Sequence, residues 1–271
     1  MKKEEDTPYN ASGPLILSGG FKSLSEAKCY HALLVLAQGC DEWKPDSRGE
    51  YRIRLPEMHR LTGKSFPNWK GYLDCLRGIR DRVRLDWGHL SRTYTHINRV
   101  GDSPVLYDIY AEMDLSGQFQ ELIFVLPQAL IQDIVKPHWF GQVDTSILFS
   151  IKSNYGFSAY LFACLMVIEK SDEKKFHSSA YTINEWRELL GVPPNAYREP
   201  SKFKAFIFKR VEKQIEKATK NTEQPIKIEF VKTSRGLHQM VITRLIMPTI
   251  SDTKKRPPEQ FVTERDRITK E

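Results

Sequence analysis

The sequence predicts an α+β protein whose two halves repeat one order of elements: a helix, a short helix, a tight turn, a long helix and a β-hairpin. Capping-box sequences stand at Ser23 to Glu26 in the first half and at Thr182 to Glu185 in the second. Gly63 and Gly191 each follow a short helix, where glycine readily adopts the left-handed conformation that ends a helix. Segments typical of strands, separated by turn residues, close each half.

The first half is expected to open with a helix from Ser23 through Ala37, with leucines available for a core. After it we expect a short helix at Leu55–Gly63, a second helix at Phe66–Leu76 with Pro67 in its first turn, strands at Val83–Trp87, Thr93–Val100, Val105–Met113 and Gln120–Leu126, and helices at Pro127–Val135 and Val143–Ile151.

The second half begins with the most apolar helix of the chain, at about Tyr155–Glu169. We then expect a charged loop at Lys170–His177, a short helix ending at Gly191, a turn at Val192–Asn195, a long helix from Pro200 to about Lys220, and a hairpin of strands Ile226–Val231 and Gln239–Leu245. This order is the plan of a winged helix-turn-helix domain. It is clearer in residues 153–246 than in residues 23–126.

The sequence therefore predicts two tandem winged-helix domains in a pseudo-twofold arrangement. The expected boundaries are a flexible N-terminal segment at residues 1–22, an N-terminal domain at 23–150, a C-terminal domain at 151–247 and a flexible tail at 248–271.

Composition favours a polyanionic partner. The 271 residues carry a formal net charge of +7, with 40% hydrophobic and 28% charged residues, as in globular proteins that bind nucleic acid or an anionic membrane face. The four cysteines are scattered without a C-x-x-C pair, which favours a reduced cytoplasm. The N-terminus lacks an apolar signal region, and the longest apolar stretch, Tyr155–Ile168, is shorter than the roughly 20 residues of a membrane span. A soluble protein without a membrane partner is expected.

The segment Arg198–Lys220 carries the functional prediction. It holds eight basic and three acidic residues, a net charge of +5. At helical spacing one side gathers Phe203, Ile207, Val211, Gln214 and Ala218, with Phe208 and Ile215 flanking them, and the other side gathers Lys202, Lys209, Lys213 and Lys220. One face can pack on its own domain while the other enters a major groove of DNA. The alternative is a solvated surface helix. The short helix, the Pro-Pro turn and the hairpin around it favour DNA contact.

The expected DNA-binding residues lie in three groups. They are Lys64, Ser65, Asn68 and Lys70 in the second helix of the first half; Arg198, Ser201, Lys202, Lys204, Lys209, Arg210 and Lys213 in the long helix and just before it; and Lys232 and Arg235 at the hairpin tip. For the first half the alternative is a mainly dimerising role, and for the hairpin tip an ordinary solvated turn.

The stretches Ile151–Leu161 and Tyr181–Gly191, Phe203-Lys204 and the closing strand resemble the C-terminal half of plasmid replication initiators of the Rep-3 type, which bind the repeated sites (iterons) of a plasmid origin. The resemblance covers roughly residues 24–246. It implies a bacterial, cytoplasmic protein whose monomer places each winged helix in a major groove and melts the origin with the host initiator and replicative helicase. It also implies a homodimer, in equilibrium with the monomer, that represses its own promoter and so takes part in copy control.

Carried over by position, Lys202, Lys204 and Lys209 are base or phosphate readers. The chain departs from the pattern at Ala205 and Phe206, where a longer basic run is usual.

No catalytic constellation is found in the sequence. Gly63-Lys64-Ser65 resembles the end of a phosphate-binding loop, but Met58 stands where its first glycine is required. The seven histidines form no H-x-H or H-E-x-x-H motif, and Tyr107 and Tyr110 lack the histidine pair of a metal-dependent nicking site. We expect no enzyme activity, no metal and no cofactor.

Two other functions remain open. A winged-helix transcriptional regulator would bind an inverted-repeat operator as a dimer, and a scaffold would use its winged helices for protein contacts and bind duplexes weakly.

Overall fold

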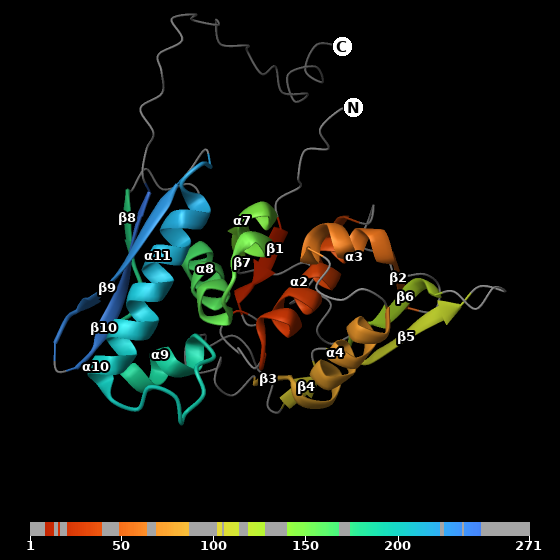
Figure 1. The fold of residues 1–271 in the computed structure, drawn as a ribbon, viewed down its shortest axis with the longest axis horizontal. Helices are drawn as coiled ribbons and strands as arrows, with labels where there is room; N and C mark the ends of the chain where they lie inside the picture. Colours follow the sequence, from red (N-terminus) through yellow and green to blue (C-terminus); the bar gives the residue numbers. More distant parts are fainter. Residues whose placement is uncertain are drawn as a thin grey trace, which may run out of the picture.

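Two halves of similar build lie side by side in the computed structural model of the chain (Figure 1). The structure describes residues 9–13, 16, 21–39, 49–63, 69–86, 102–104, 106–113, 119–127, 140–167, 174–222, 225–234 and 236–244. The predicted mixture of helices and antiparallel sheets is confirmed.

The first half packs helices on one face of an antiparallel sheet. Its elements are α2 (Leu24–Gly39), β2 (Tyr51–Arg54), α3 (Leu55–Thr62), α4 (Trp69–Arg82), β3 (Arg84–Asp86), β4 (Asp102–Pro104), β5 (Asp108–Met113) and β6 (Phe119–Val125). The main sheet has the order β2-β6-β5, and β3 pairs with β4 separately. Leu33 of α2, Tyr72 of α4 and Phe124 of β6 are fully buried between these layers.

The second half repeats this sequence of elements, except that its described residues hold no counterpart of the β3–β4 pair. Its elements are α8 (Asn154–Met166), β8 (Lys175–His177), α9 (Ile183–Leu189), α10 (Pro200–Phe203), a π-helical segment η1 (Lys204–Phe208), α11 (Lys209–Thr219), β9 (Ile226–Lys232) and β10 (His238–Arg244). The sheet order β8-β10-β9 matches β2-β6-β5, because in both halves the strand after the first helix pairs with the last strand. The order helix, strand, helix, helix, strand, strand is therefore present twice.

The predicted helix ends are confirmed by their hydrogen bonds. The Thr182 hydroxyl accepts from the Glu185 amide at 3.2 Å, and the Glu185 carboxylate accepts from the Thr182 amide at 2.7 Å. At the start of α2 the Ser23 hydroxyl accepts from the Glu26 amide, while the Glu26 carboxylate reaches the Lys22 amide rather than that of Ser23. Gly63 and Gly191 both have a φ of 66°, the left-handed conformation expected after a short helix.

A short strand pair joins the halves. Strand β1 (Tyr9–Ser12) pairs antiparallel with β7 (Phe140–Val143), and α7 (Thr145–Ser150) follows β7. Strand β7 lies tight against α8, because a Cβ on Gly141 would come within 2.7 Å of the Leu165 backbone nitrogen. The prediction that residues 1–22 lack fixed structure is thus wrong for Tyr9–Ser12. This segment is ordered by pairing with a strand about 130 residues away, which no local pattern signals.

Several other predicted elements need correction. Strand β2 lies between the helices expected at Ser23–Ala37 and Leu55–Gly63, where no strand was expected. Strand β8 lies within the expected charged loop at Lys170–His177. Strand β4 lies between the strands expected at Thr93–Val100 and Val105–Met113, where turn residues were expected to separate them. The expected helix at Val143–Ile151 divides into the end of β7 and α7. The helix expected at Phe66–Leu76 is observed as α4 and continues to Arg82. The expected strand at Thr93–Val100, residues 128–135 of the expected helix at Pro127–Val135, and the tail at 248–271 lie outside the described residues.

A buried histidine lies where β1 meets both halves. His31 of α2 is 1% exposed, and its Nδ1 lies 2.8 Å from the Tyr9 hydroxyl. The rings of Tyr9, Phe21, Tyr30 and Phe157 surround it at centroid distances between 5.3 and 6.2 Å. Burial among these rings lowers the pKa of His31 to about 3, because the charged imidazolium would lose its hydration there.

We expect acid to destabilise the protein through His31. The unfolded chain takes up a proton at a pKa of about 6.5 while the folded chain does not, so this contribution is complete above pH 6.5 and is lost as pH falls toward 3. Between pH 6.5 and 4.5 the loss is about 2 kcal/mol. Urea unfolding at a series of pH values measures it, with His31→Gln as the variant that cannot titrate. Equal slopes of unfolding free energy against pH for both proteins would contradict this assignment.

Candidate nucleic-acid interface

A row of cations lines the exposed side of the long helix in the second half. We call it the lysine ridge, and it consists of Lys202, Lys209, Arg210, Lys213, Lys217 and Lys220, all exposed. The four lysines that helical spacing placed opposite the core are all among them, so that part of the prediction is confirmed. Lys202 pairs with Glu199 at 2.9 Å and Lys209 with Glu212 at 3.3 Å. Both lysines remain more than half exposed, so these pairs hold them weakly.

The opposite side of this helix is anchored in the core. Phe203, Ile207, Phe208, Val211 and Ile215 are each at most 3% exposed. The helix is continuous from Pro200 to Thr219, as predicted, but its second turn is a π-helix in which the Lys209 amide donates to the Lys204 carbonyl five residues back. This wider turn accommodates one more inward side chain. Regular helical spacing had placed Gln214 and Ala218 on the core side, with Ile215 at its flank. In the structure Ile215 is buried, and Gln214 and Ala218 are only half-buried.

Arg187 of α9 organises the turn before the helix. Its guanidinium donates to the Tyr197 carbonyl at 3.0 Å, to the Pro193 carbonyl at 3.3 Å and to the Ala196 carbonyl, and it lies 4.9 Å from the Phe203 ring centroid. Tyr197 has a φ of 51°, a backbone conformation that residues other than glycine rarely adopt. The turn is therefore held from inside by one buried cation.

The hairpin β9–β10 packs behind the helix through aromatic rings. Phe208 stacks on Phe230 with a centroid distance of 3.9 Å, and the Phe230 amide donates to the Glu212 carboxylate at 3.0 Å. The Thr219 hydroxyl at the helix end bonds to both the amide and the carbonyl of Ile226. Helix and hairpin thus form one unit.

The predicted site residues differ in exposure and in whether the structure describes them. Arg198, Ser201, Lys202, Lys209, Arg210 and Lys213 are exposed on or just before the helix. Lys204 is half-buried on its flank near His238, whose pKa is lowered by burial and then by the Lys204 ammonium. Lys232 is exposed at the end of β9. Lys64, Ser65, Asn68 and Arg235 lie outside the described residues.

The corresponding helix of the first half has a different surface. Lys70 is exposed near the start of α4, as expected, and the exposed side chains that follow at helical spacing are Asp74, Arg77 and Asp81. This stripe alternates between positive and negative charge. It therefore attracts a polyanion less strongly than the lysine ridge does.

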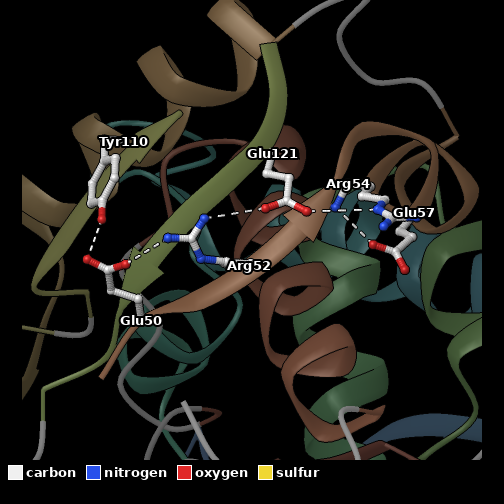
Figure 2. A network of polar contacts seen from close by, with 6 residues as sticks. All are labelled: Glu50, Arg52, Arg54, Glu57, Tyr110 and Glu121. Atoms are coloured by element: carbon white, nitrogen blue, oxygen red, sulfur yellow. Dashed lines mark hydrogen bonds and ion pairs between the residues drawn. The ribbon is translucent and has the colours of Figure 1, made fainter. Parts of the chain in front are cut away.

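The sheet of the first half carries charges that pair with one another (Figure 2). Arg52 pairs with Glu50 at 3.3 Å and with Glu121 at 3.6 Å, and Arg54 pairs with Glu121 at 3.8 Å. The network extends to the Tyr110 hydroxyl, which donates to Glu50, and to Glu57 of α3, which accepts from the Arg54 amide. Three carboxylates and two guanidinium groups make up this network, so these described residues carry no excess of positive charge.

Two residues of the interface were not predicted from the sequence. Arg187 was not singled out because nothing in its local pattern shows that it turns inward to bind carbonyls. Phe206 was noted only as a departure from a basic run, yet it is 56% exposed between Lys202 and Lys209 of the ridge. The sequence feature that could have identified Phe206 is its position as a large aromatic residue on the polar side of an amphipathic helix.

The described residues form neither a metal-binding cluster nor a membrane-spanning helix. No group of three or more His, Cys, Asp or Glu side chains in that part of the chain is placed to hold a metal ion. No helix there combines the length and the apolar character needed to cross a bilayer.

Comparison with known proteins gives a structural match only. No family model matches the sequence, and no curated protein matches it significantly. The crystal structure of the Pi initiator protein in complex with iteron DNA matches with a TM-score of 0.58 and 13% identity, over 90% of this chain and 98% of that one. A structure of RctB domains 2-3 matches with a TM-score of 0.43 and 8% identity, over 82% of each chain. The resemblance expected from the sequence is confirmed at the level of architecture: this chain has the fold of the Pi initiator protein.

Proposed function

We propose that this protein is a replication initiator that binds repeated double-stranded DNA sites at a plasmid origin through two winged helices. The observation that carries the proposal is the lysine ridge, a cationic helix face backed by a rigid aromatic core and flanked by a hairpin. A helix of this kind fits the major groove, and its lysines can neutralise phosphates on either side.

The repeated topology supports the tandem winged-helix assignment. In each half the helix before the last two strands, α4 or α10–α11, stands where a recognition helix stands, and β5–β6 or β9–β10 forms the wing. The structural neighbour was crystallised with iteron DNA, and its coverage of 90% of this chain spans both halves. Two such units in one chain allow a monomer to contact two successive grooves.

The difference between the two helices supports unequal roles. The C-terminal ridge supplies most of the phosphate contacts, and the charge-balanced α4 reads DNA more weakly or contributes to dimerisation. Autorepression as a dimer, cooperation with the host initiator and helicase, and a place in the bacterial cytoplasm belong to the same proposal. We further propose that the protein is not an enzyme.

Footprinting on the DNA that flanks its own gene tests the proposal. An initiator protects tandem direct repeats. Protection of a single inverted repeat would instead favour the regulator, and the absence of any protection at moderate salt would favour the scaffold.

We expect Lys209→Gln with Lys213→Gln to weaken duplex binding roughly tenfold per lysine at 0.1 M salt, because each removes a phosphate contact. The slope of log affinity against log salt should become shallower by about 1.8, or about 0.9 per contact. Fluorescence anisotropy with a labelled duplex at several salt concentrations measures both quantities.

Lys175→Gln is the matched control. Lys175 is exposed on β8 and lies opposite Thr243, which is also the register partner of Lys227, so it is on the outer face of the sheet, away from the buried Ile228 side. The control loses the same charge but no proposed contact. Equal weakening by the control and the ridge variants would show that net charge, and not the ridge, determines binding.

A further inference from the structure

An aromatic side chain interrupts the lysine ridge. Phe206 is 56% exposed, and along the helix it lies four residues from Lys202, three from Lys209 and four from Arg210. Residues at these separations are neighbours on a helix surface. A large apolar group among cations gains nothing from solvent and contributes nothing to phosphate binding.

The ring is held in position before any ligand arrives. Phe206 stacks on Tyr197 with a centroid distance of 5.7 Å and an interplanar angle of 28°. Tyr197 is fixed by its left-handed backbone and by the hydrogen bond from Arg187 to its carbonyl. The stack therefore presents a rigid apolar surface at low entropic cost to a partner.

The π-helical turn sets the direction of this ring. Phe206 lies within η1, and Ile207 and Phe208, the two residues after it, are both buried. With the two following residues turned inward, Phe206 is directed outward with the ridge. Single π-turns occur frequently at functional sites in helices.

We propose that Phe206 is a base-reading residue that contacts the C5-methyl group of thymine in the major groove. The inference rests on the proposed DNA-binding function and adds a base class to it. Phe206 has no hydrogen-bonding group, so it cannot read the donor and acceptor atoms of the bases. The thymine methyl is the apolar group that base pairs present in the major groove, and phenylalanine is a known partner for it. The flanking cations bring the duplex to this ring.

Replacing thymine with uracil in the DNA tests the proposal, because the change removes only the methyl group. A preferred duplex is first selected from a random library with the full chain. Each thymine of that duplex is then replaced in turn by deoxyuridine, and affinities are measured for the wild type and for Phe206→Ala. Phe140→Ala is the control, since Phe140 is a 41% exposed phenylalanine on β7, outside the ridge.

At one or two positions the wild type and Phe140→Ala should bind the uracil duplex about fourfold more weakly, the effect of losing one buried methyl group. Phe206→Ala should bind thymine and uracil duplexes equally at those positions. Its salt slope should be unchanged, because no phosphate contact is lost. Unaltered methyl sensitivity in Phe206→Ala, or no sensitivity at any position in the wild type, would overturn the inference while leaving DNA binding intact. Failure to select any duplex would contradict the proposed function itself.

Discussion

Replacing Trp186 with alanine is expected to lower the free energy of unfolding by about 3–5 kcal/mol. Trp186 is fully buried, and its ring lies 5.0–5.6 Å from the rings of Phe162, Tyr181 and Phe230. These residues come from α8, from the segment after β8 and from β9, so one side chain joins the layers of the second half. Its removal leaves a cavity, which the surrounding helix and sheet could close only by shifting toward each other.

A hydrogen bond adds to this loss. The Trp186 indole donates to the His238 carbonyl at 2.9 Å. That carbonyl also accepts from the Tyr181 amide at 2.9 Å, so alanine removes one of its two donors. Trp186→Phe is the matched variant, because it keeps most of the ring area and loses only the hydrogen bond and some volume. We expect about half of the alanine effect for it. Urea unfolding followed by far-ultraviolet circular dichroism measures both, and an alanine loss below about 1 kcal/mol would be inconsistent with this role.

The helix ends could be predicted from the sequence because their signals are local. The capping box at Thr182 and Glu185 links residues three apart, and the left-handed glycines at 63 and 191 satisfy a backbone requirement of the helix end itself. The hairpin β9–β10 could be predicted for the same reason, since its strands are joined by a short turn. In these cases the stabilising partner lies within a few residues.

The missed strands depend on distant partners. Tyr51 pairs with Phe124 and Lys175 with Thr243, and each of these strands is only three or four residues long. Strand β2 does alternate buried and exposed side chains, but four residues are too few to separate a strand from a loop. Such segments become strands because a neighbouring edge offers its hydrogen bonds.

In the candidate site, too, the features with local causes could be predicted and those that depend on tertiary packing could not. The exposure of Lys209 and Lys213 follows from helical periodicity, which the chain obeys on both sides of η1. The π-turn itself could not be predicted, because it depends on tertiary packing: Ile207 is buried, and Phe208 stacks on Phe230 of β9. Arg187 points inward because the backbone of the Pro-Pro turn places carbonyl groups within its reach. The positions of these carbonyls cannot be read from a pattern of side chains.

Arg187→Met is expected to destabilise the second half by about 3 kcal/mol. The Arg187 side chain is buried, and its guanidinium binds three carbonyls of the turn from Pro193 to Tyr197. A hydrogen bond to a charged group contributes about 1.5–3 kcal/mol, and methionine replaces the packing of the side chain but none of these bonds. Arg187→Lys should recover little, because an ammonium cannot reproduce the planar fork of donors. Urea unfolding measures these losses.

A variant of the nearby Arg198 distinguishes an effect on stability from an effect on DNA contact. Arg198 is exposed in the same segment and donates to Asn195 at 2.8 Å. Arg198→Met should therefore change stability by less than about 0.5 kcal/mol, while it weakens duplex binding if Arg198 contacts a phosphate. Arg187→Met should show the opposite order: a large loss of stability, and a loss of affinity only because Tyr197 and the start of α10 are no longer held in place. Similar stability losses for the two variants would show that the carbonyl bonds of Arg187 do not hold the turn, and the rigidity attributed to the Tyr197–Phe206 stack would then need another source.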